Sequence, residues 1–239
     1  MSNSHFFAMI SRMKYINRWG LMNNTFNENI SEHSLQVAMF THCLILMHND
    51  KFGENLNADR GAVLGMYHDS SEIITGDLPT PIKYFNPEIC DAYKKVENLA
   101  EERLLSLLPQ SLRHYYDDIL HYNEKDELLR KYVKAGDKIS ALTKCMEEIK
   151  VGNREFTDAF ETTKKSLENM NMPVVDEFIK ELDIKDEKDV LVICLITLGK
   201  SLKDSTANLK APIIINIKNN RGKQLILQDD KYKIKEPLE

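Results

Sequence analysis

Long apolar runs are missing from this chain, because no stretch approaches about 18 consecutive apolar residues. We therefore expect no membrane span. Residues 1–7 also lack a basic segment that leads into an apolar stretch and a small-residue cleavage site. We therefore expect no export signal, and a cytoplasmic location.

Paired cysteines and an excess of basic residues are missing as well. The four cysteines, Cys43, Cys90, Cys145 and Cys194, are far apart, and none forms a zinc-ribbon or thioredoxin spacing. A net charge of −5 disfavours a nucleic acid polymer as partner, because such binding rests largely on basic clusters that meet phosphates. Small phosphorylated molecules stay compatible with this charge, since one or two placed cations are enough to hold them.

Glycine (9 residues) and proline (7 residues) are sparse in the 239-residue chain, and 42 % of the residues are apolar. This composition is typical of a globular protein, and the length allows one ordinary domain with an appendage or two small domains. From residue 5 to about 182, apolar residues recur every three or four positions, which predicts an all-α helical bundle. Helices are expected over about 31–48, 59–74, 89–107, 128–150 and 158–170.

The residue composition of the chain changes after about residue 181. Residues 190–198, 211–217 and 224–227 are rich in β-branched side chains, which predicts strands. We place a domain boundary near residue 182. The prediction is a helical domain over residues 1–182 and a β-rich appendage over residues 183–239.

Four residues in the helical part form a set of donors that a divalent metal ion would accept. His33 falls in the first turn of a predicted helix that begins at Ser31, His68 and Asp69 stand near the end of another helix, and Asp137 lies in a third. Facing helices of a bundle build metal sites in this way. The alternative is that His33 caps its helix, His68 bonds within the core, and the two aspartates form ion pairs.

Three further features carry candidate chemistry. Glu72 shares a helical face with His68 and Asp69 if that helix continues, so it can orient or deprotonate an attacking water; otherwise it is a solvated or salt-bridged carboxylate. Arg18 and Trp19 suit a phosphate and a flat sugar or base, whereas such a pair more often packs a surface cation on a core aromatic. The loop 77–80 offers a carboxylate and a hydroxyl, or simply ends a helix.

The chain resembles the YfbR family of bacterial 5'-deoxynucleotidases, within the HD-domain phosphohydrolase superfamily. The resemblance is carried by His-Phe-Phe-Ala at 5–8, Ile-Asn-Arg-Trp at 16–19, Ser-Glu-His-Ser-Leu-Gln-Val-Ala-Met at 31–39, Met-Tyr-His-Asp at 66–69 and Thr-Gly-Asp-Leu-Pro-Thr-Pro at 75–81. It extends over about residues 1–180. It implies an HD-domain bundle that hydrolyses deoxyribonucleoside 5'-monophosphates to deoxynucleosides and phosphate.

The resemblance also implies roles for individual residues. The implied metal ligands are His33, His68, Asp69 and Asp137, and the implied catalytic residues are Glu72 and Arg18. The implied substrate-binding residues are Arg18, Trp19, Asp69, Asp77, Leu78, Pro79, Thr80 and Asp137. The implied ion is cobalt, with manganese, copper or zinc as substitutes, and the implied assembly is a homodimer.

The tail is similar to the last third of FliW, a family of flagellar assembly factors that bind flagellin and a translational regulator. The similar segments are 188–193, 206–216 and 222–227. The earlier strands of that fold are missing, which leaves strand edges unpaired. We therefore do not expect this tail to bind flagellin or the regulator.

Two other functions fit parts of the same pattern. An HD-type hydrolase could act on a nucleoside triphosphate or a cyclic nucleotide, although one metal set and a single Arg18 fit a monoester better. Alternatively, the tail is a binding module and the helical part its carrier. Identifying whether orthophosphate, pyrophosphate or triphosphate is released distinguishes the first alternative from a monoesterase. Specific binding of flagellin or the regulator by residues 183–239 alone would support the second.

Overall fold

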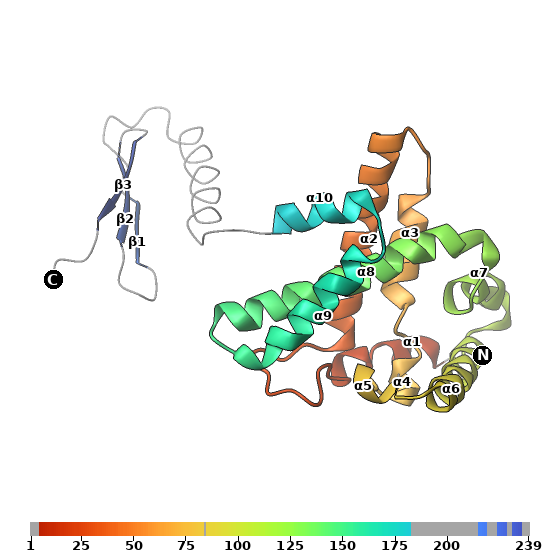
Figure 1. Cartoon of the computed structure of the whole chain (residues 1–239). Helices are drawn as coiled ribbons and strands as arrows, with labels where there is room; N and C mark the ends of the chain where they lie inside the picture. The colour runs from red at the N-terminus through yellow and green to blue at the C-terminus, as the bar shows by residue number, and fades with distance from the viewer. Residues whose placement is uncertain (1–4, 84, 183–214, 219–223, 229–230, 236–239) are drawn as a thin grey trace. The chain divides into compact units, whose positions relative to one another are not determined.

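The computed structural model describes residues 5–83, 85–182, 215–218, 224–228 and 231–235 (Figure 1). The chain divides into two compact units, Met1–Asp183 and Ile184–Glu239. The helices are α1 (Phe6–Ile10), α2 (Ile30–Phe52), α3 (Ala58–Tyr67), α4 (Glu72–Thr75), α5 (Thr80–Lys83), α6 (Pro87–Ser106), α7 (Gln110–Leu120), α8 (Glu127–Lys150), α9 (Thr157–Glu168) and α10 (Pro173–Leu182). Short 3₁₀ turns occupy Met13–Tyr15, Glu124–Asp126 and Arg154–Phe156.

The predicted helical bundle is confirmed. Apart from one isolated β-bridge between Asn17 and Asn29, residues 5–83 and 85–182 fold into helices and their connections. None of the helices in the described part of the chain is both long and apolar enough to cross a membrane.

Helix α2 begins earlier than predicted. Its N-cap is Asn29 rather than Ser31. The Asn29 side chain accepts hydrogen bonds from the backbone N–H groups of Ser31 and Glu32, and the Glu32 carboxylate accepts one from the Asn29 N–H. Such a reciprocal capping box fixes the first turn. His33 lies at the end of this turn, as the sequence predicts.

The predicted helix over 59–74 is wrong in one respect, because it breaks into α3 and α4. Between them the backbone tightens into i to i+3 hydrogen bonds, from Ser70 N–H to the Tyr67 carbonyl and from Glu72 N–H to the Asp69 carbonyl, each 3.0 Å long. Consecutive serines favour such turns over a continuing helix. Glu72 therefore starts a new helix and does not continue the face of His68 and Asp69.

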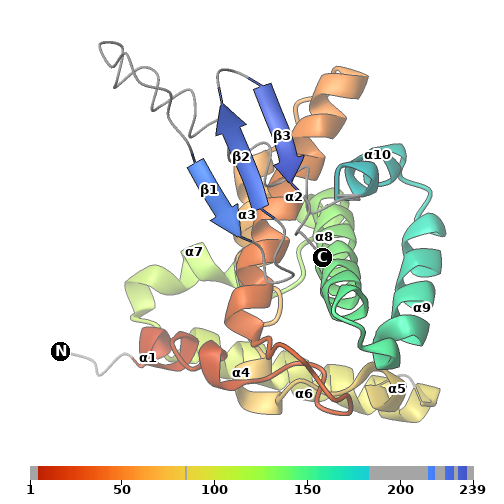
Figure 2. The same cartoon turned by 90° about the vertical axis from the view of Figure 1, so that its left-hand side faces the viewer.

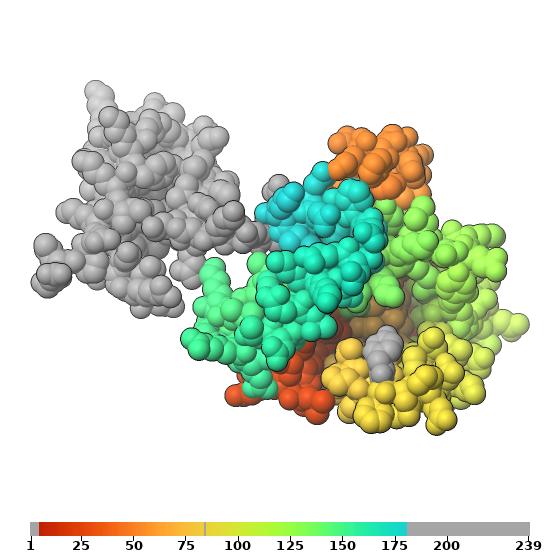
Figure 3. Space-filling model, in the orientation of Figure 1, coloured from red at the N-terminus to blue at the C-terminus, as the bar shows by residue number. Residues whose placement is uncertain are grey.

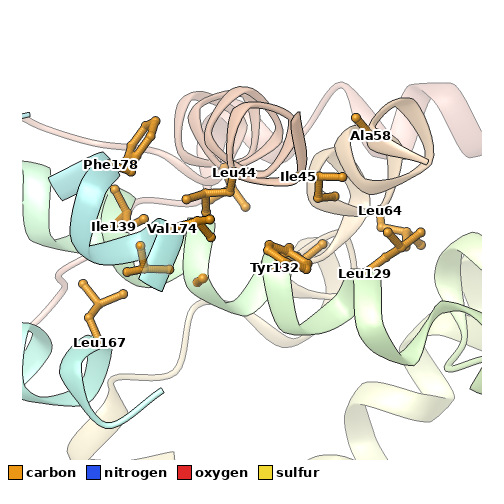
Figure 4. Close-up of a cluster of buried hydrophobic side chains, with 14 of the residues drawn as sticks. Leu44, Ile45, Ala58, Leu64, Leu129, Tyr132, Ile139, Leu167, Val174 and Phe178 are labelled. Atoms are coloured by element: carbon orange, nitrogen blue, oxygen red, sulfur yellow. The ribbon is translucent and has the colours of Figure 1, made fainter. Parts of the chain in front are cut away.

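The core of unit 1 lies where α2, α3 and α8 meet (Figure 4). Leu44 and Ile45 of α2, Leu64 of α3 and Ile139 of α8 are buried there, together with Val174 of α10. Helix α9 packs against α8 (Figure 2). A second apolar cluster joins α1, α6 and α7, and α6 also contacts α4 and α5.

Two glycines allow the central helices to approach closely. A Cβ on Gly65 of α3 would lie 3.1 Å from the Ala38 Cα of α2. A Cβ on Gly136 of α8 would lie 2.6 Å from Thr41 Oγ1 and 3.1 Å from the Val37 carbonyl oxygen. Interiors at this packing density have no slack for an added methyl group.

In the second unit the structure describes three strands, β1 (Ile215–Lys218), β2 (Gln224–Gln228) and β3 (Lys231–Lys235). They form an antiparallel sheet in the order β1-β2-β3. Ile217 is opposite Leu225, which is in turn opposite Ile234. The strand predicted over 190–198 lies outside the described residues.

Replacing Gly136 with Ala tests the close approach of α8 to α2. Overpacking costs about 1–3 kcal/mol, which exceeds the gain of about 1 kcal/mol in helix propensity. We therefore expect a net loss of about 1 kcal/mol in the free energy of unfolding, measured by urea denaturation. Gly20→Ala is the control, because a Cβ there meets nothing within 4 Å. A Gly136→Ala variant as stable as the wild type would contradict the packing argument.

Candidate active site

Helices α2 and α8 and the turn that follows α3 bring the four predicted metal ligands together. Nε2 of His33 on α2 lies 3.1 Å from Oδ1 of Asp137 on α8 and 3.5 Å from Oδ2 of Asp69. Nε2 of His68 lies 3.1 Å from the same Asp69 oxygen. One ligand atom from each of His33, His68 and Asp69 falls within 4.8 Å of the others. Asp137 is not one of these three residues, but its carboxylate lies against His33.

The hydrogen bonds behind each imidazole select a tautomer. His68 Nδ1 lies 2.7 Å from the Gly65 carbonyl oxygen, which can only accept, so the neutral ring carries its proton on Nδ1. His33 Nδ1 lies 2.9 Å from Ser140 Oγ, and that hydroxyl donates its proton to Gln36 Oε1 at 2.5 Å. Ser140 must therefore accept from His33. Both neutral rings present the Nε2 lone pair to the carboxylates.

This donor set fits a divalent transition ion. The Nε2 atoms of His33 and His68 are buried and make no hydrogen bond within the described part of the chain. Burial lowers the pKa of His68, but the negative charge of Asp69 beside it raises that pKa overall. A proton and a metal ion would thus compete for the same nitrogen. Two imidazoles and two carboxylates suit cobalt, manganese, copper or zinc.

Of the alternatives for the four ligands, the structure contradicts helix capping by His33, because Asn29 caps α2. His68 does bond to a core carbonyl, but through Nδ1, which leaves Nε2 for the site. Asp69 does form an ion pair, and its partner is Arg18, another predicted site residue, with Arg18 Nη1 3.3 Å from Asp69 Oδ2.

Arg18 is buried beside the carboxylates and is not a surface cation. Its side chain is 13 % exposed, and Nε lies 3.4 Å from Glu28 Oε2. Burial lowers the pKa of Arg18, but the charges of Asp69, Asp137, Glu28 and Asp77 raise it overall. The guanidinium is therefore a fixed positive charge at the edge of the predicted cage.

Trp19 has a left-handed backbone, with a φ of 61°. Its ring centroid is 5.3 Å from that of Phe156, with the planes tilted by 56°, and its Nε1–H donates to Glu28 Oε2 at 2.7 Å. Burial raises the pKa of Asp77, whereas the charge of Arg18 and the backbone of Trp19 lower it. The Asp77 carboxyl, in the loop after α4, therefore lies close to the segment 18–19.

Glu72 on α4 is buried, and its Oε2 has no hydrogen-bond partner among the described residues. Burial, followed by the negative charges of Asp69 and Asp77, raises the pKa of Glu72 to about 9. Despite the break between α3 and α4, this carboxyl shares the electrostatic environment of both aspartates. It holds a proton at neutral pH.

The loop between α4 and α5 starts at Gly76, whose φ of 74° favours glycine. The Tyr93 hydroxyl of α6 donates to the Gly76 carbonyl at 3.2 Å. Of the predicted loop residues, Asp77 reaches the segment 18–19, Leu78 and Pro79 are half-buried, and Thr80 is exposed at the first residue of α5. The surface is hollowed between the yellow part of the chain, which includes α5 and α6, and the green part, which includes α8 (Figure 3).

Sequence reasoning missed Glu28, Ser140 and Gln36. Ser140 and Gln36 each follow a predicted ligand by three residues, so helical spacing from Asp137 and His33 could have suggested them. Glu28 lies in a loop, where no spacing rule applies.

Two family profiles match the chain. The profile described as "5'-deoxynucleotidase YfbR-like" matches residues 5–184, and the profile of the FliW protein matches residues 162–238. A 5'-deoxynucleotidase from Yersinia pestis (strain Pestoides F) and one from Yersinia pseudotuberculosis serotype O:1b (strain IP 31758) are each 50 % identical over 178 residues. That length is 74 % of this chain and 89 % of each relative.

Solved structures share the fold at lower identity. An HD-domain phosphohydrolase from Listeria innocua superposes with a TM-score of 0.66 at 22 % identity, over 84 % of this chain and 98 % of its own. The cyanophage S-2L HD phosphohydrolase DatZ, bound to dA and one catalytic Zn²⁺, gives 0.53 at 20 % identity over 74 % and 93 %. Because the match to 5'-deoxynucleotidases is 50 % identical over 178 residues and covers 89 % of their length, this chain belongs to the YfbR-like family, and its helical unit has the HD-domain fold.

Proposed function

We propose that this protein is a metal-dependent phosphomonoesterase that hydrolyses deoxyribonucleoside 5'-monophosphates to deoxynucleosides and phosphate. The observation that carries the proposal is the pair of buried, unbonded Nε2 atoms of His33 and His68 facing two carboxylates, with Arg18 against one of them. The names of the Yersinia relatives support the reaction, and the Zn²⁺ named for DatZ supports a divalent ion.

His33, His68, Asp69 and Asp137 would hold the ion. When bound, it would polarise the phosphoryl group and lower the pKa of a coordinated water. We favour cobalt, with manganese, copper or zinc as substitutes, because mixed nitrogen and oxygen donors accept all four.

Arg18 binds and orients the phosphate. Its guanidinium is permanently charged and already placed against Asp69 and Glu28, so an incoming phosphate dianion meets a fork that needs little reordering. The surrounding carboxylates repel that dianion unless a cation neutralises part of their charge. The proposed activity therefore requires a bound metal ion.

Glu72 takes part in proton transfer. Because its pKa is raised to about 9, the carboxyl is protonated at neutral pH and can donate to the leaving 5'-oxygen of the deoxynucleoside. A cation nearby would lower this pKa and favour the carboxylate, which can accept a proton from water. Either way, a buried carboxyl next to the cage supports a role in proton transfer for Glu72.

Trp19 and the loop from Asp77 through Leu78 and Pro79 to Thr80 form the nucleoside side of the site. Asp77 lies close to the Trp19 backbone, and the indole offers a flat wall. We propose that Trp19 excludes a 2'-hydroxyl and so selects deoxyribose. Asp69 and Asp137 would contact substrate as well as the ion.

We further propose that residues 1–182 form the HD-domain nucleotidase and that residues 183–239 form a β-rich appendage related to FliW, supported by β1–β3 and by the FliW match. The enzyme would work in the cytoplasm as a homodimer. A stripe of exposed apolar side chains on α2, formed by Leu35, Met39 and Leu46, supports self-association. We do not propose binding to flagellin or its regulator.

The assay that tests the function starts from chelator-stripped protein reloaded with Co²⁺, Mn²⁺, Cu²⁺ or Zn²⁺. We expect orthophosphate release from deoxyribonucleoside monophosphates, with ribonucleotides at least about 10-fold slower. His68→Ala should lose about 100-fold or more, because it removes a donor for the ion. The control is His42→Ala, a half-exposed histidine on α2. Full activity in His68→Ala, or release of pyrophosphate or triphosphate instead, would contradict the proposal.

Ser140→Ala tests how the His33 tautomer is held. Without the hydroxyl that accepts from Nδ1, we expect about 10-fold weaker binding of Co²⁺ or Zn²⁺ by the stripped protein, measured by competition with a chromophoric chelator. Thr143→Ala is the matched control on α8, because among the described residues the Thr143 hydroxyl bonds only to the Ile139 carbonyl of its own helix. Equal affinities in the two variants would show that the relay does not orient His33.

The stability of the metal-free protein should depend on Glu72 and pH. A carboxyl whose pKa rises from 4.5 to about 9 on folding stabilises the fold fully below 4.5 and loses that contribution as pH rises toward 9. Glu72→Gln removes this dependence, so its stability relative to the wild type should grow by about 1 kcal/mol per pH unit between pH 5 and 8. Urea denaturation at both pH values measures the difference. A constant difference across this range would contradict the raised pKa.

A further inference from the structure

Glu28 lies between the metal-ligand side and the nucleoside side of the site, and neither uses it directly. Its side chain is 12 % exposed. Oε2 accepts the Trp19 Nε1–H at 2.7 Å and lies 3.4 Å from Arg18 Nε, while Oε1 lies 3.7 Å from His33 Nδ1. One carboxylate therefore touches the indole, the guanidinium and the back of a predicted ligand.

The backbone around Glu28 is fixed on both sides. The Arg18 N–H donates to the Glu28 carbonyl at 2.9 Å, and the Ile30 N–H donates to the Ile16 carbonyl at 3.0 Å, so residues 16–18 and 28–30 run as a short antiparallel pair. The next residue, Asn29, caps α2. Glu28 is thus attached to the start of the helix that carries His33.

The two donors that meet Glu28 differ in what they require. The Trp19 Nε1–H needs only an acceptor oxygen, whereas the Arg18 guanidinium is held more tightly by a carboxylate than by a neutral acceptor.

We propose that Glu28 is a positioning residue that fixes the Trp19 indole and the Arg18 guanidinium relative to His33, so that deoxyribose selectivity and phosphate binding depend on one side chain. The proposal rests on the proposed function for its catalytic consequences. Its structural part, the immobilisation of Trp19, stands apart from any reaction.

Trp19 is the single tryptophan of the chain, so tryptophan fluorescence, excited at a wavelength that the 9 tyrosines absorb little, reports on this site alone. In the full-length, metal-loaded protein we compare Glu28→Ala, Glu28→Gln and the control Glu102→Ala, an exposed carboxylate on α6. For Glu28→Ala we expect acrylamide quenching to rise at least about 2-fold. The KM for deoxynucleotides should rise about 10-fold and the preference for deoxyribose should fall about 10-fold. Metal content should be unchanged.

Glu28→Gln separates positioning from folding, because its amide keeps an acceptor for the indole but loses the charge beside Arg18. We expect wild-type quenching and selectivity with a raised KM. Glu28→Ala with wild-type quenching, KM and selectivity would overturn the proposal. If Glu28→Ala does not fold, a Glu28→Gln variant with wild-type KM overturns it. If the wild type hydrolyses no deoxynucleotide, the proposed function fails while the quenching comparison still decides the role of Glu28.

Discussion

The close approach of α3 and α8 to α2 is the constraint on which the site depends. Gly65 and Gly136 stand where a side chain would collide with the backbone of α2. Gly65 precedes His68 by three residues and accepts its Nδ1–H, and Gly136 directly precedes Asp137. The same contact that builds the core therefore brings imidazole and carboxylate groups of α2, α8 and the turn after α3 within reach of one another.

Helix α8 serves as a common support for both sides of the site. Asp137, Ser140, Lys144 and Glu148 follow one another at intervals of three or four residues and so share one face. Asp137 joins the predicted ligands, and Ser140 orients His33. Glu148 is fully buried, pairs with Lys144 and accepts the N–H groups at the tip of the loop that follows Trp19. Moving the proposed metal side of the site relative to the proposed nucleoside side would therefore disrupt the hydrogen bonds and the ion pair along this face.

Periodicity predicted the helices because their stabilising contacts repeat locally, and the donor types of His33, His68, Asp69 and Asp137 suggested the cage. The break between α3 and α4 was not predicted, because the apolar pattern of the sequence continues through it. In the structure, tight turns at Ser70 and Ser71 replace the helical hydrogen bonds. The role that we propose for Glu28 could not be predicted either. It depends on a pairing between two loops, and no local spacing records which loops meet.

The packing at the two glycines has a consequence for the order of assembly. Zinc fingers fold only when their ion arrives, so their binding free energy is spent on ordering the chain. Here an apolar core independent of the ion already holds the donors in place. Chelation should therefore yield an intact apoprotein that can exchange one metal for another, and the ion at the proposed site would then follow the local supply.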